Sequence, residues 1–360
     1  MGARLKGLPD LPSRIAGLEG EAHARAERLL DVRVVIGHTD PPPELEPWLA
    51  SHFGSANAVR SQTVVKVTNL ATLEAAIFAP LRSRRPVDGD AADRDLHAEI
   101  VATGGDPFCS PETGTPADTF GRVRGGHTVT GANAALADAH HAVIVFDTHD
   151  PLAFDASLVA DLLSTGREWA DRARADDAEA ANYILIWNCL WRAGGSIVHG
   201  HAQALLGAGL HYARLERFHR DARAYRADHG LDLVADLVEL HRDLGLAIES
   251  SGVTTVAHLT PIKERELLVV GRPGMDERDP AFTDAVARAL IAYRDRIGVS
   301  SFNLALWRGP LDGRWPEFAP IVRLVDRGDP FSRPSDIGAM ELYGTPIVGS
   351  DPYEVMELLA

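Results

Sequence analysis

The segment His199–Gln203, which reads HGHAQ, is the feature that most constrains how this chain can fold. It places two imidazoles and an amide at alternate positions, and the apolar run Ala204–Leu206 continues it. Successive side chains of a strand point to opposite faces, so residues two apart share a face. We therefore predict a strand with His199, His201 and Gln203 on one side. Three polar groups together are not typical of a core, and the pattern indicates a site on the face of a sheet.

Strand-length apolar runs and segments of helical period surround this segment. The expected strands are Gln62–Val67, Ala142–Phe146, Tyr183–Trp187, Thr254–Leu259, Glu266–Val270, Phe302–Trp307 and Ile321–Val325. The expected helices are Glu19–Leu30, Ala156–Arg174, Leu231–Glu249, Asp284–Ile297 and Pro352–Leu359. Residues 87–118 are rich in Asp, Gly, Pro and Thr and are expected to form loop. Because Tyr183–Trp187 matches Phe302–Trp307, we expect a duplicated strand–helix–strand unit.

Composition argues against several classes of protein. The net charge of −15 and a pI near 5.4 argue against a protein that binds nucleic acid duplexes, which needs a concentrated basic face. The apolar runs are too short to cross a bilayer, and the first residues lack the apolar core of a secretory signal. We therefore expect a cytoplasmic protein with no membrane partner, in which Cys109 and Cys189 do not form a disulfide.

The histidine segment has the chemistry of a phosphorus nucleophile. The neutral nitrogen of an imidazole attacks phosphorus without prior deprotonation near neutral pH. Gln203 offers an amide donor to the oxygens of an α-phosphate, and Ser196 with the Gly194-Gly195 backbone offers further donors. Two histidines at this spacing are also typical of a zinc site, and a single histidine is commonly structural. The residues by themselves leave these alternatives open.

The stretch Trp187–Gln203, WNCLWRAGGSIVHGHAQ, resembles the active-site segment of the galactose-1-phosphate uridylyltransferase family, the His-x-His-x-Gln branch of the histidine-triad superfamily. The resemblance implies that His201 is the covalent nucleophile and that Gln203 stabilises the nucleotidylated intermediate. It also implies that Asn188 and Ser196, which fall at the family's spacing, contact the nucleotide phosphates. The implied fold is α+β, with duplicated histidine-triad-like units that form an antiparallel sheet flanked by helices.

The resemblance further implies a metal site. The first histidine of the motif is a ligand of structural zinc in several family members, together with a C-x-x-C pair and a histidine that follows an earlier strand. His199, His149 and Cys109 match three of these ligands, and Asp106 stands in place of the first cysteine. Because Asp also binds zinc, both a Cys-His-His-Asp zinc site and a site without metal agree with the sequence. A second metal site is not expected, because Trp315–Pro320 lacks the family's later His-x-His pair.

Weaker matches concern the substrate. Arg82 and Arg85 lie in a segment that resembles the family's Arg-x-x-Arg-Pro motif, which implies nucleotide or phosphate contacts, with a solvated basic loop as the alternative. Asn133 matches an Asn of the family's nucleotide-binding segment, but the flanking aromatic residues are absent. Ile337–Leu342 resembles the late Val-Gly-Tyr-Glu segment that helps to hold the hexose, without its tyrosine. These departures leave the base and the sugar open.

The resemblance covers residues 62–345 and is strongest over residues 140–206. It implies a catalytic half over residues 61–215 and a degenerate second half over residues 216–360, after an N-terminal extension of unclear role over residues 1–60. The predicted function is exchange of a nucleoside monophosphate between a nucleotide sugar and a sugar 1-phosphate, in a homodimer. One alternative is a phosphorylase or hydrolase of ADP-sugars or dinucleoside polyphosphates that uses the same intermediate. The other is a non-catalytic nucleotide-binding protein with a relic site.

Overall fold

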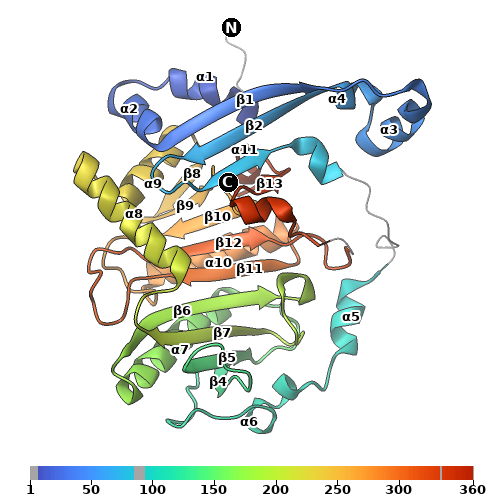
Figure 1. Ribbon diagram of the computed structural model, residues 1–360. Helices are drawn as coiled ribbons and strands as arrows, with labels where there is room; N and C mark the ends of the chain where they lie inside the picture. The colour runs from blue at the N-terminus through green and yellow to red at the C-terminus, as the bar shows by residue number, and fades with distance from the viewer. Residues whose placement is uncertain (1–6, 85–93, 333–334, 360) are drawn as a thin grey trace.

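The computed structural model describes residues 7–84, 94–332 and 335–359. Within these ranges, a nine-stranded sheet extends through the molecule, and a four-stranded sheet lies above it in Figure 1. Every strand pairing in the large sheet is antiparallel. Helices flank this sheet, which confirms the α+β fold with an antiparallel sheet.

The nine strands have the order β4-β5-β7-β6-β11-β12-β10-β9-β8. Their bounds are β4 Thr128–Ala132, β5 His140–Phe146, β6 Ala180–Cys189, β7 His201–Ala208, β8 Ala247–Ser250, β9 Val253–Ala257, β10 Glu264–Val270, β11 Phe302–Trp307 and β12 Ile321–Asp326. The central strands β6 and β11 pair with each other, with Asn188 opposite Asn303. One continuous sheet therefore joins the two halves of the chain.

The two sides of this sheet have the same topology. In the first, β5 is followed by helix α7 (Ala156–Asp176), β6 and β7. In the second, β10 is followed by helix α10 (Pro280–Asp295), β11 and β12. From the central pair outward, the order β6-β7-β5-β4 corresponds to β11-β12-β10-β9. The expected duplicated strand–helix–strand unit is therefore present.

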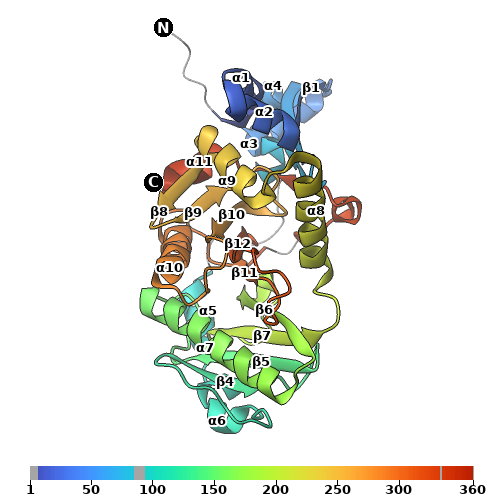
Figure 2. The same ribbon diagram turned by 90° about the vertical axis from the view of Figure 1, so that its left-hand side faces the viewer.

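Helices α7 and α10 cover one face of the large sheet, and α8 (Ala213–His229) lies on the other side, as Figure 2 shows. Helix α7 approaches so closely that a Cβ atom at Gly166 would lie 2.7 Å from atoms of both Leu185 and Tyr183. Only glycine fits this contact, because interiors are packed to van der Waals distance. Trp187 is fully buried nearby, with aromatic neighbours Phe146, Phe154 and Phe302. This apolar layer leaves the opposite face of β6 and β7 for polar groups.

The four-stranded sheet combines the N-terminal part of the described chain with its C-terminal part. Its order is β1-β2-β3-β13, with bounds β1 Leu30–His38, β2 Ser61–Asn69, β3 Ala75–Phe78 and β13 Ile347–Val348. Helix α2 (Gly20–Leu29) attaches it to α9 (Leu233–Asp243) through ion pairs of Arg25 and Arg28 with Asp236. The boundary expected after residue 60 lies within this sheet, between α4 (Ala56–Arg60) and β2.

Two stretches differ from the sequence-based expectation. Residues 87–118 are not loop throughout, because Asp95 caps α5 (Leu96–Ala102) by accepting from the backbone N–H groups of His97 and Ala98. The helix expected over Leu231–Glu249 is also too long. It ends at Asp243, because Gly245 takes a positive φ of 75° and the chain turns into β8.

Strand β1 and helix α8 are further elements that the sequence analysis does not predict. The outer residues Val34, Val35 and Ile36 of β1 are exposed, so the strand has no alternating pattern of burial to read. The remaining helices are α1 Leu11–Ala16, α3 Glu46–Phe53, α6 Pro111–Gly114 and α11 Pro352–Leu359. Among the described residues, none of the helices combines the length and apolar character needed to span a bilayer.

Candidate active site

His201 and Gln203 lie on the face of the sheet opposite α7. Leu185 contacts α7 and pairs with Ala204 across β6 and β7. The next pair, Ile186 and Gln203, therefore points the other way. His201 is the first residue of β7 and shares this face with Gln203. We call it the open face because α7 and α10 lie on the opposite face of the sheet (Figure 2). The strand thus places an imidazole and an amide side by side.

The His201 ring is buried and fixed by one hydrogen bond. Its Nδ1 lies 2.8 Å from the backbone carbonyl oxygen of His199. Because a carbonyl oxygen only accepts, Nδ1 carries the proton and Nε2 keeps a free lone pair. Burial lowers the pKa of His201, and the bond to His199 opposes this effect, so the imidazole is held neutral. Phe108 packs against the ring at a centroid distance of 4.9 Å.

Gln203 is held from the neighbouring strand β5. Its Oε1 lies 2.8 Å from Nε2 of His141, and Nδ2 of Asn133 lies 3.2 Å from the same nitrogen. Asn133 Oδ1 accepts from the backbone N–H of Ala135 at 3.0 Å. The structure therefore places Asn133, a predicted nucleotide contact, beside the residue that holds Gln203.

Asn188 lies on β6 and is joined to the second half of the sheet. Its Oδ1 accepts a hydrogen bond of 2.7 Å from Asn303 Nδ2 on β11. Asn303 also donates to the Ala193 carbonyl oxygen at 2.8 Å and accepts from Arg327. Because the Asn188 oxygen is occupied, its amide nitrogen is the group that can donate to a ligand. Ser196 is exposed in the loop that leads to β7.

Gly200 allows the histidine segment to approach the end of β5. Its N–H donates to the His149 carbonyl oxygen at 3.1 Å, and its own carbonyl accepts from Phe146 N at 2.9 Å. A Cβ atom at this position would lie 2.6 Å from the Phe146 ring. The glycine between the two histidines therefore brings His199 next to His149.

Asp106, Cys109, His149 and His199 form a cluster whose ligand atoms all lie within 4.8 Å of one another. The two Nδ1 atoms are 3.2 Å apart, and Cys109 Sγ lies 3.4 Å from His149 and 3.5 Å from His199. The carboxylate of Asp106 lies 3.9 Å from His149 Nδ1 and 4.0 Å from His199 Nδ1. Tetrahedral zinc, with bonds of about 2.0–2.3 Å, needs ligand atoms roughly 3.3–3.8 Å apart. The spacing is close to that of a zinc site.

The hydrogen bonds around this cluster also fit a cation. His199 Nε2 lies 2.9 Å from the Phe146 carbonyl oxygen, and His149 Nε2 lies 3.0 Å from that of Ile100. Both Nε2 atoms therefore carry protons, and both Nδ1 lone pairs face the cluster. Asp106 Oδ2 is buried and finds no hydrogen-bond partner among the described residues. A divalent cation would satisfy all three atoms, so this donor set fits zinc.

A cavity of about 470 Å³ lies on the open face in the second half of the sheet. Asn303 lines it, so the cavity adjoins Asn188. Trp307 provides an aromatic wall. Each cation that lines it has an acidic partner: Lys263 with Glu341, Arg327 with Asp336, Arg323 with Glu266, and Arg214 with Glu74. Balanced charges beside an aromatic ring suit a neutral polar ligand group better than a further anion.

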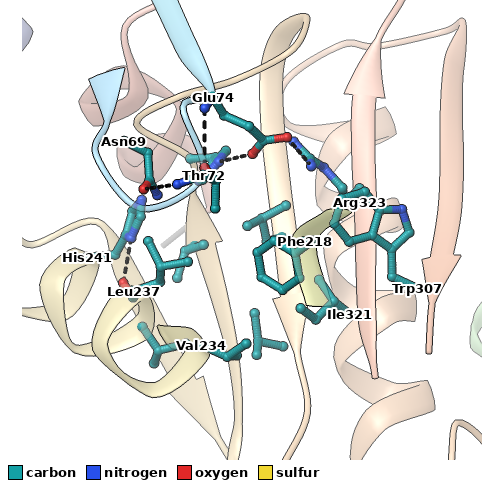
Figure 3. A pocket seen from close by; sticks show the side chains of 15 residues that line it. Asn69, Thr72, Glu74, Phe218, Val234, Leu237, His241, Trp307, Ile321 and Arg323 are labelled. Carbon is teal, nitrogen blue, oxygen red and sulfur yellow. Dashed lines mark hydrogen bonds and ion pairs between the residues drawn. The ribbon is translucent and has the colours of Figure 1, made fainter. Parts of the chain in front are cut away.

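A second, smaller cavity lies between α9 and the sheet (Figure 3). Its wall is mostly apolar and includes Phe218, Val234, Leu237 and Ile321. At one end the Glu74 carboxylate accepts a hydrogen bond of 2.9 Å from Arg323. The volume of about 30 Å³ has room for a water molecule or two and not for a nucleotide.

Arg82 and the segment Ile337–Leu342 come from parts of the chain other than the histidine segment. Arg82 is exposed on the short helix Pro80–Arg84, which follows β3 in the small sheet. Arg85 lies outside the described residues. Ile337 and Glu341, from the segment that resembles the family's hexose loop, line the 470 Å³ cavity.

Solved structures share this fold. An ADP-glucose phosphorylase from Arabidopsis thaliana, solved with bound ADP-glucose, matches with a TM-score of 0.63 at 15% identity, over 80% of this chain and 96% of that chain. A GalT-like protein from the same plant matches with a TM-score of 0.59 at 15% identity, over 80% of this chain and 96% of that chain. A uridylyltransferase matches with 0.56 at 15% identity, over 68% and 87%. The chain has the fold of these proteins. No family model matches the sequence, and no curated protein matches it.

Three residues of the site are not predicted from the sequence. His141 stands at the start of an apolar run, and Asn303 interrupts another, so each is a polar residue in a buried strand. Arg327 follows β12 and has no such signal. A polar residue within an apolar strand is the pattern that could have identified the first two.

Proposed function

We propose that this protein transfers a nucleoside monophosphate between a nucleotide sugar and a sugar 1-phosphate through a covalent intermediate on His201. The observation that carries the proposal is the 2.8 Å hydrogen bond between His201 Nδ1 and the His199 carbonyl oxygen. It leaves an unprotonated Nε2 on the open face, beside the amide of Gln203. A nucleophile and a donor for the phosphate oxygens are thus adjacent.

In the first step, His201 Nε2 attacks the α-phosphorus of the nucleotide sugar. The N–P bond forms, the bond from the α-phosphorus to the bridging oxygen breaks, and the sugar 1-phosphate leaves with the electron pair of that bond. Nδ1–H keeps its bond to the His199 carbonyl oxygen, which favours the cationic ring of the intermediate. Gln203 and Asn188 would donate to the phosphate oxygens as charge builds there.

In the second step, a sugar 1-phosphate oxygen attacks the same phosphorus, and the electron pair of the N–P bond returns to Nε2. The 470 Å³ cavity beside Asn303 is the place we propose for the sugar, because its charges are balanced and Trp307 offers a ring to stack on. Ser196, Arg82, Arg85 and Asn133 remain proposed contacts to the nucleotide. Zinc held by Asp106, Cys109, His149 and His199 would stabilise the segment that carries the nucleophile.

The test is intact-mass spectrometry after incubation with UDP-, ADP- and GDP-glucose in phosphate-free buffer. We expect a mass gain of one nucleoside monophosphate with one of these donors, and loss of the adduct when glucose 1-phosphate or galactose 1-phosphate is added. The mass of the adduct identifies the base. No adduct with any donor, from freshly prepared protein, would contradict the covalent mechanism and favour a non-catalytic nucleotide-binding protein.

Phosphorolysis is a second candidate because the fold matches that of an ADP-glucose phosphorylase. The same intermediate would then lose its nucleoside monophosphate to inorganic phosphate, with release of a nucleoside diphosphate. Release of the adduct by phosphate and not by a sugar 1-phosphate would favour this candidate. Release by water alone would indicate a hydrolase. The homodimer and the cytoplasmic location also stay predictions, and light scattering on the purified protein measures the first.

A further inference from the structure

His141 is buried at the start of β5 and contacts Gln203 on β7. The two residues are 62 positions apart in the sequence, and the antiparallel pairing of β5 with β7 brings them together. The contact is 2.8 Å, between His141 Nε2 and Gln203 Oε1. His141 therefore contacts the amide that, in the proposed function, donates to the phosphate.

The backbone fixes which nitrogen of His141 donates. The N–H of Ala137 donates to His141 Nδ1 at 3.1 Å. A backbone N–H is always a donor, so Nδ1 accepts and Nε2 of the neutral ring carries the proton. Asn133 Nδ2, 3.2 Å from Nε2, is also a donor because Asn133 Oδ1 accepts from Ala135, so among the described residues Nε2–H has the Gln203 side chain as its acceptor. The atom of Gln203 that meets Nε2–H must then be its oxygen. This chain of donors determines the orientation of the Gln203 amide, which no other contact in the described part of the chain does.

The consequence is that the NH₂ group of Gln203 is left free. Within the described residues this nitrogen has no hydrogen-bond partner, while the oxygen is taken by His141. His141 is opposite Leu205, on the far side of Gln203 from His201 along β7. Because the Gln203 oxygen is directed to His141, the free NH₂ group lies on the side of His201, the proposed nucleophile. With the amide turned over, an oxygen lone pair would face the phosphate and repel it.

We propose that His141 is a positioning residue: it holds the Gln203 oxygen so that the amide N–H groups face the phosphorus that His201 attacks. This inference depends on the proposed function. His141 itself touches neither the nucleotide nor the reacting atoms. The turn between β4 and β5 contributes to this positioning. Its residue Ala137 donates to His141 Nδ1, and the proton of the ring is therefore on Nε2.

The experiment is a double-mutant cycle on the single-turnover rate of adduct formation, with UDP-glucose and ADP-glucose as the donors. Gln203→Ala should slow the reaction about 100-fold, the cost of losing one donor to a developing oxyanion. His141→Leu should slow it about 10- to 100-fold, as for a misplaced group. The double variant should be no slower than Gln203→Ala, because His141 acts only through Gln203. The donor concentration at half-saturation should change less than about threefold in His141→Leu.

Two further variants separate positioning from loss of structure. His141→Gln keeps an N–H donor near the place of Nε2 and should restore the rate to within about threefold of the wild type. His141→Asn has a shorter side chain that does not reach Gln203, and it should stay as slow as His141→Leu. Thermal unfolding of each variant shows whether it is folded at the assay temperature, so that the comparison of Gln with Asn is valid even if Leu unfolds.

The outcomes distinguish this inference from the proposed function. If Gln203→Ala is slow but His141→Leu and His141→Asn react like the wild type, the positioning role is wrong and the nucleotidyl transfer stands. If the two losses multiply in the double variant, His141 does not act through Gln203. If the wild type forms no adduct, the proposed function is wrong. If Gln203→Ala forms the adduct as fast as the wild type, the role that the proposed function gives to Gln203 is wrong.

Discussion

The two halves of the large sheet share a topology but place different side chains at corresponding positions. β7 begins with His201 and has Gln203 two residues later, whereas β12 begins with Ile321 and has Arg323 two residues later. Gln203 is paired with Ile186 of β6, and Arg323 is paired with Ala305 of β11. The same strand end therefore presents an imidazole and an amide in one half, and an apolar side chain and a guanidinium in the other.

The two halves differ in which polar atoms at these positions are left unpaired. Arg323 is buried between Glu266 at 2.6 Å and Glu74 at 2.9 Å, and Glu74 belongs to the turn that precedes β3 of the small sheet. The second half thus uses its polar position to hold the two sheets together. In the first half, the hydrogen bonds of His201 and Gln203 end on Nδ1 and Oε1, which leaves Nε2 and the NH₂ group for a ligand.

The strongest test of this comparison replaces His201, the proposed nucleophile. His201→Ala should abolish the covalent adduct and lower turnover on the order of 10⁴-fold or more, because no other group can form the intermediate. Ile321→Val, at the corresponding position of β12, should leave adduct formation unchanged. Intact-mass spectrometry and steady-state kinetics measure both variants. An adduct of unchanged yield in His201→Ala would assign the nucleophile to another residue.

The second test concerns Glu74, which pairs with Arg323 and which we expect to stabilise the fold. Burial alone would raise the pKa of Glu74, but Arg323 and His258 outweigh it and hold the pKa well below its usual range. The ionised form therefore contributes stability that is complete above about pH 4.3, the pKa of an unfolded glutamate. This contribution is lost as the pH falls from there toward the lower folded value.

Glu74→Gln should accordingly lower the free energy of unfolding by about 3 kcal/mol at pH 7, since it removes one partner of a buried pair. Urea unfolding at pH 7 and at pH 4 measures the effect, and the gap between variant and wild type should narrow at the lower pH. Glu112→Gln, which breaks the exposed pair with Arg124, is the control and should leave stability unchanged. An equal gap at both pH values would contradict the role assigned to the Glu74 charge.

A third test addresses the cluster of candidate metal ligands in the first half, which no group of side chains repeats among the described residues of the second half. Zinc analysis of the purified protein should find about one zinc per chain. Asp106→Asn keeps the oxygen that accepts from Phe108 and Cys109 but removes the charge, and should weaken zinc binding about 100-fold in a chelator competition. Asp95→Asn alters a similar helix cap outside the cluster and serves as the control. Equal zinc retention in both variants would remove Asp106 from the ligand set.

The smallest expected effect concerns the cavity of the second half. Trp307→Leu should raise the KM for the sugar 1-phosphate about tenfold, because it removes the ring on which we propose that the sugar stacks. The rate of adduct formation at saturating nucleotide sugar should stay within about threefold of the wild type. Trp315→Leu, in the loop before β12, is the matched control. If both variants change KM equally, the 470 Å³ cavity does not hold the sugar.

Much of the first half could be predicted because its signals are local. The alternation in His199–Gln203 and the helical period of Ala156–Arg174 each depend on neighbouring residues. The structure has α7 at the second place and β7 at the first, although β7 begins at His201 and His199 precedes the strand. The prediction of a loop over residues 87–118 is partly wrong because it also depends on local signals alone. Helix α5 has only seven residues, and its cap at Asp95 is a weaker signal than the surrounding Gly and Pro.

The candidate metal ligands show how far the sequence reaches into the site. The resemblance proposes Asp106, Cys109, His149 and His199 as a group, and the fold brings these four together. It gives no indication that Asn303 anchors Asn188 or that His141 holds Gln203. Such pairs join different strands, and a periodic pattern along one strand carries no information on the residue that faces it across the sheet.

The sequence by itself determined which groups are present: a histidine and a glutamine on one face of a strand, a set of candidate metal ligands, and a repeated strand–helix–strand unit. The first and the third follow from local periodicity and residue chemistry, and the second follows from the resemblance of the sequence to a known family. Only the tertiary structure decided which atoms of those groups are free. The His199 carbonyl oxygen that fixes the His201 proton is held in place where Gly200 bonds to Phe146 and His149. The pairing of β5 with β7 directs the Gln203 oxygen to His141 and leaves the NH₂ group free, because a hydrogen bond between distant segments selects the orientation of the amide.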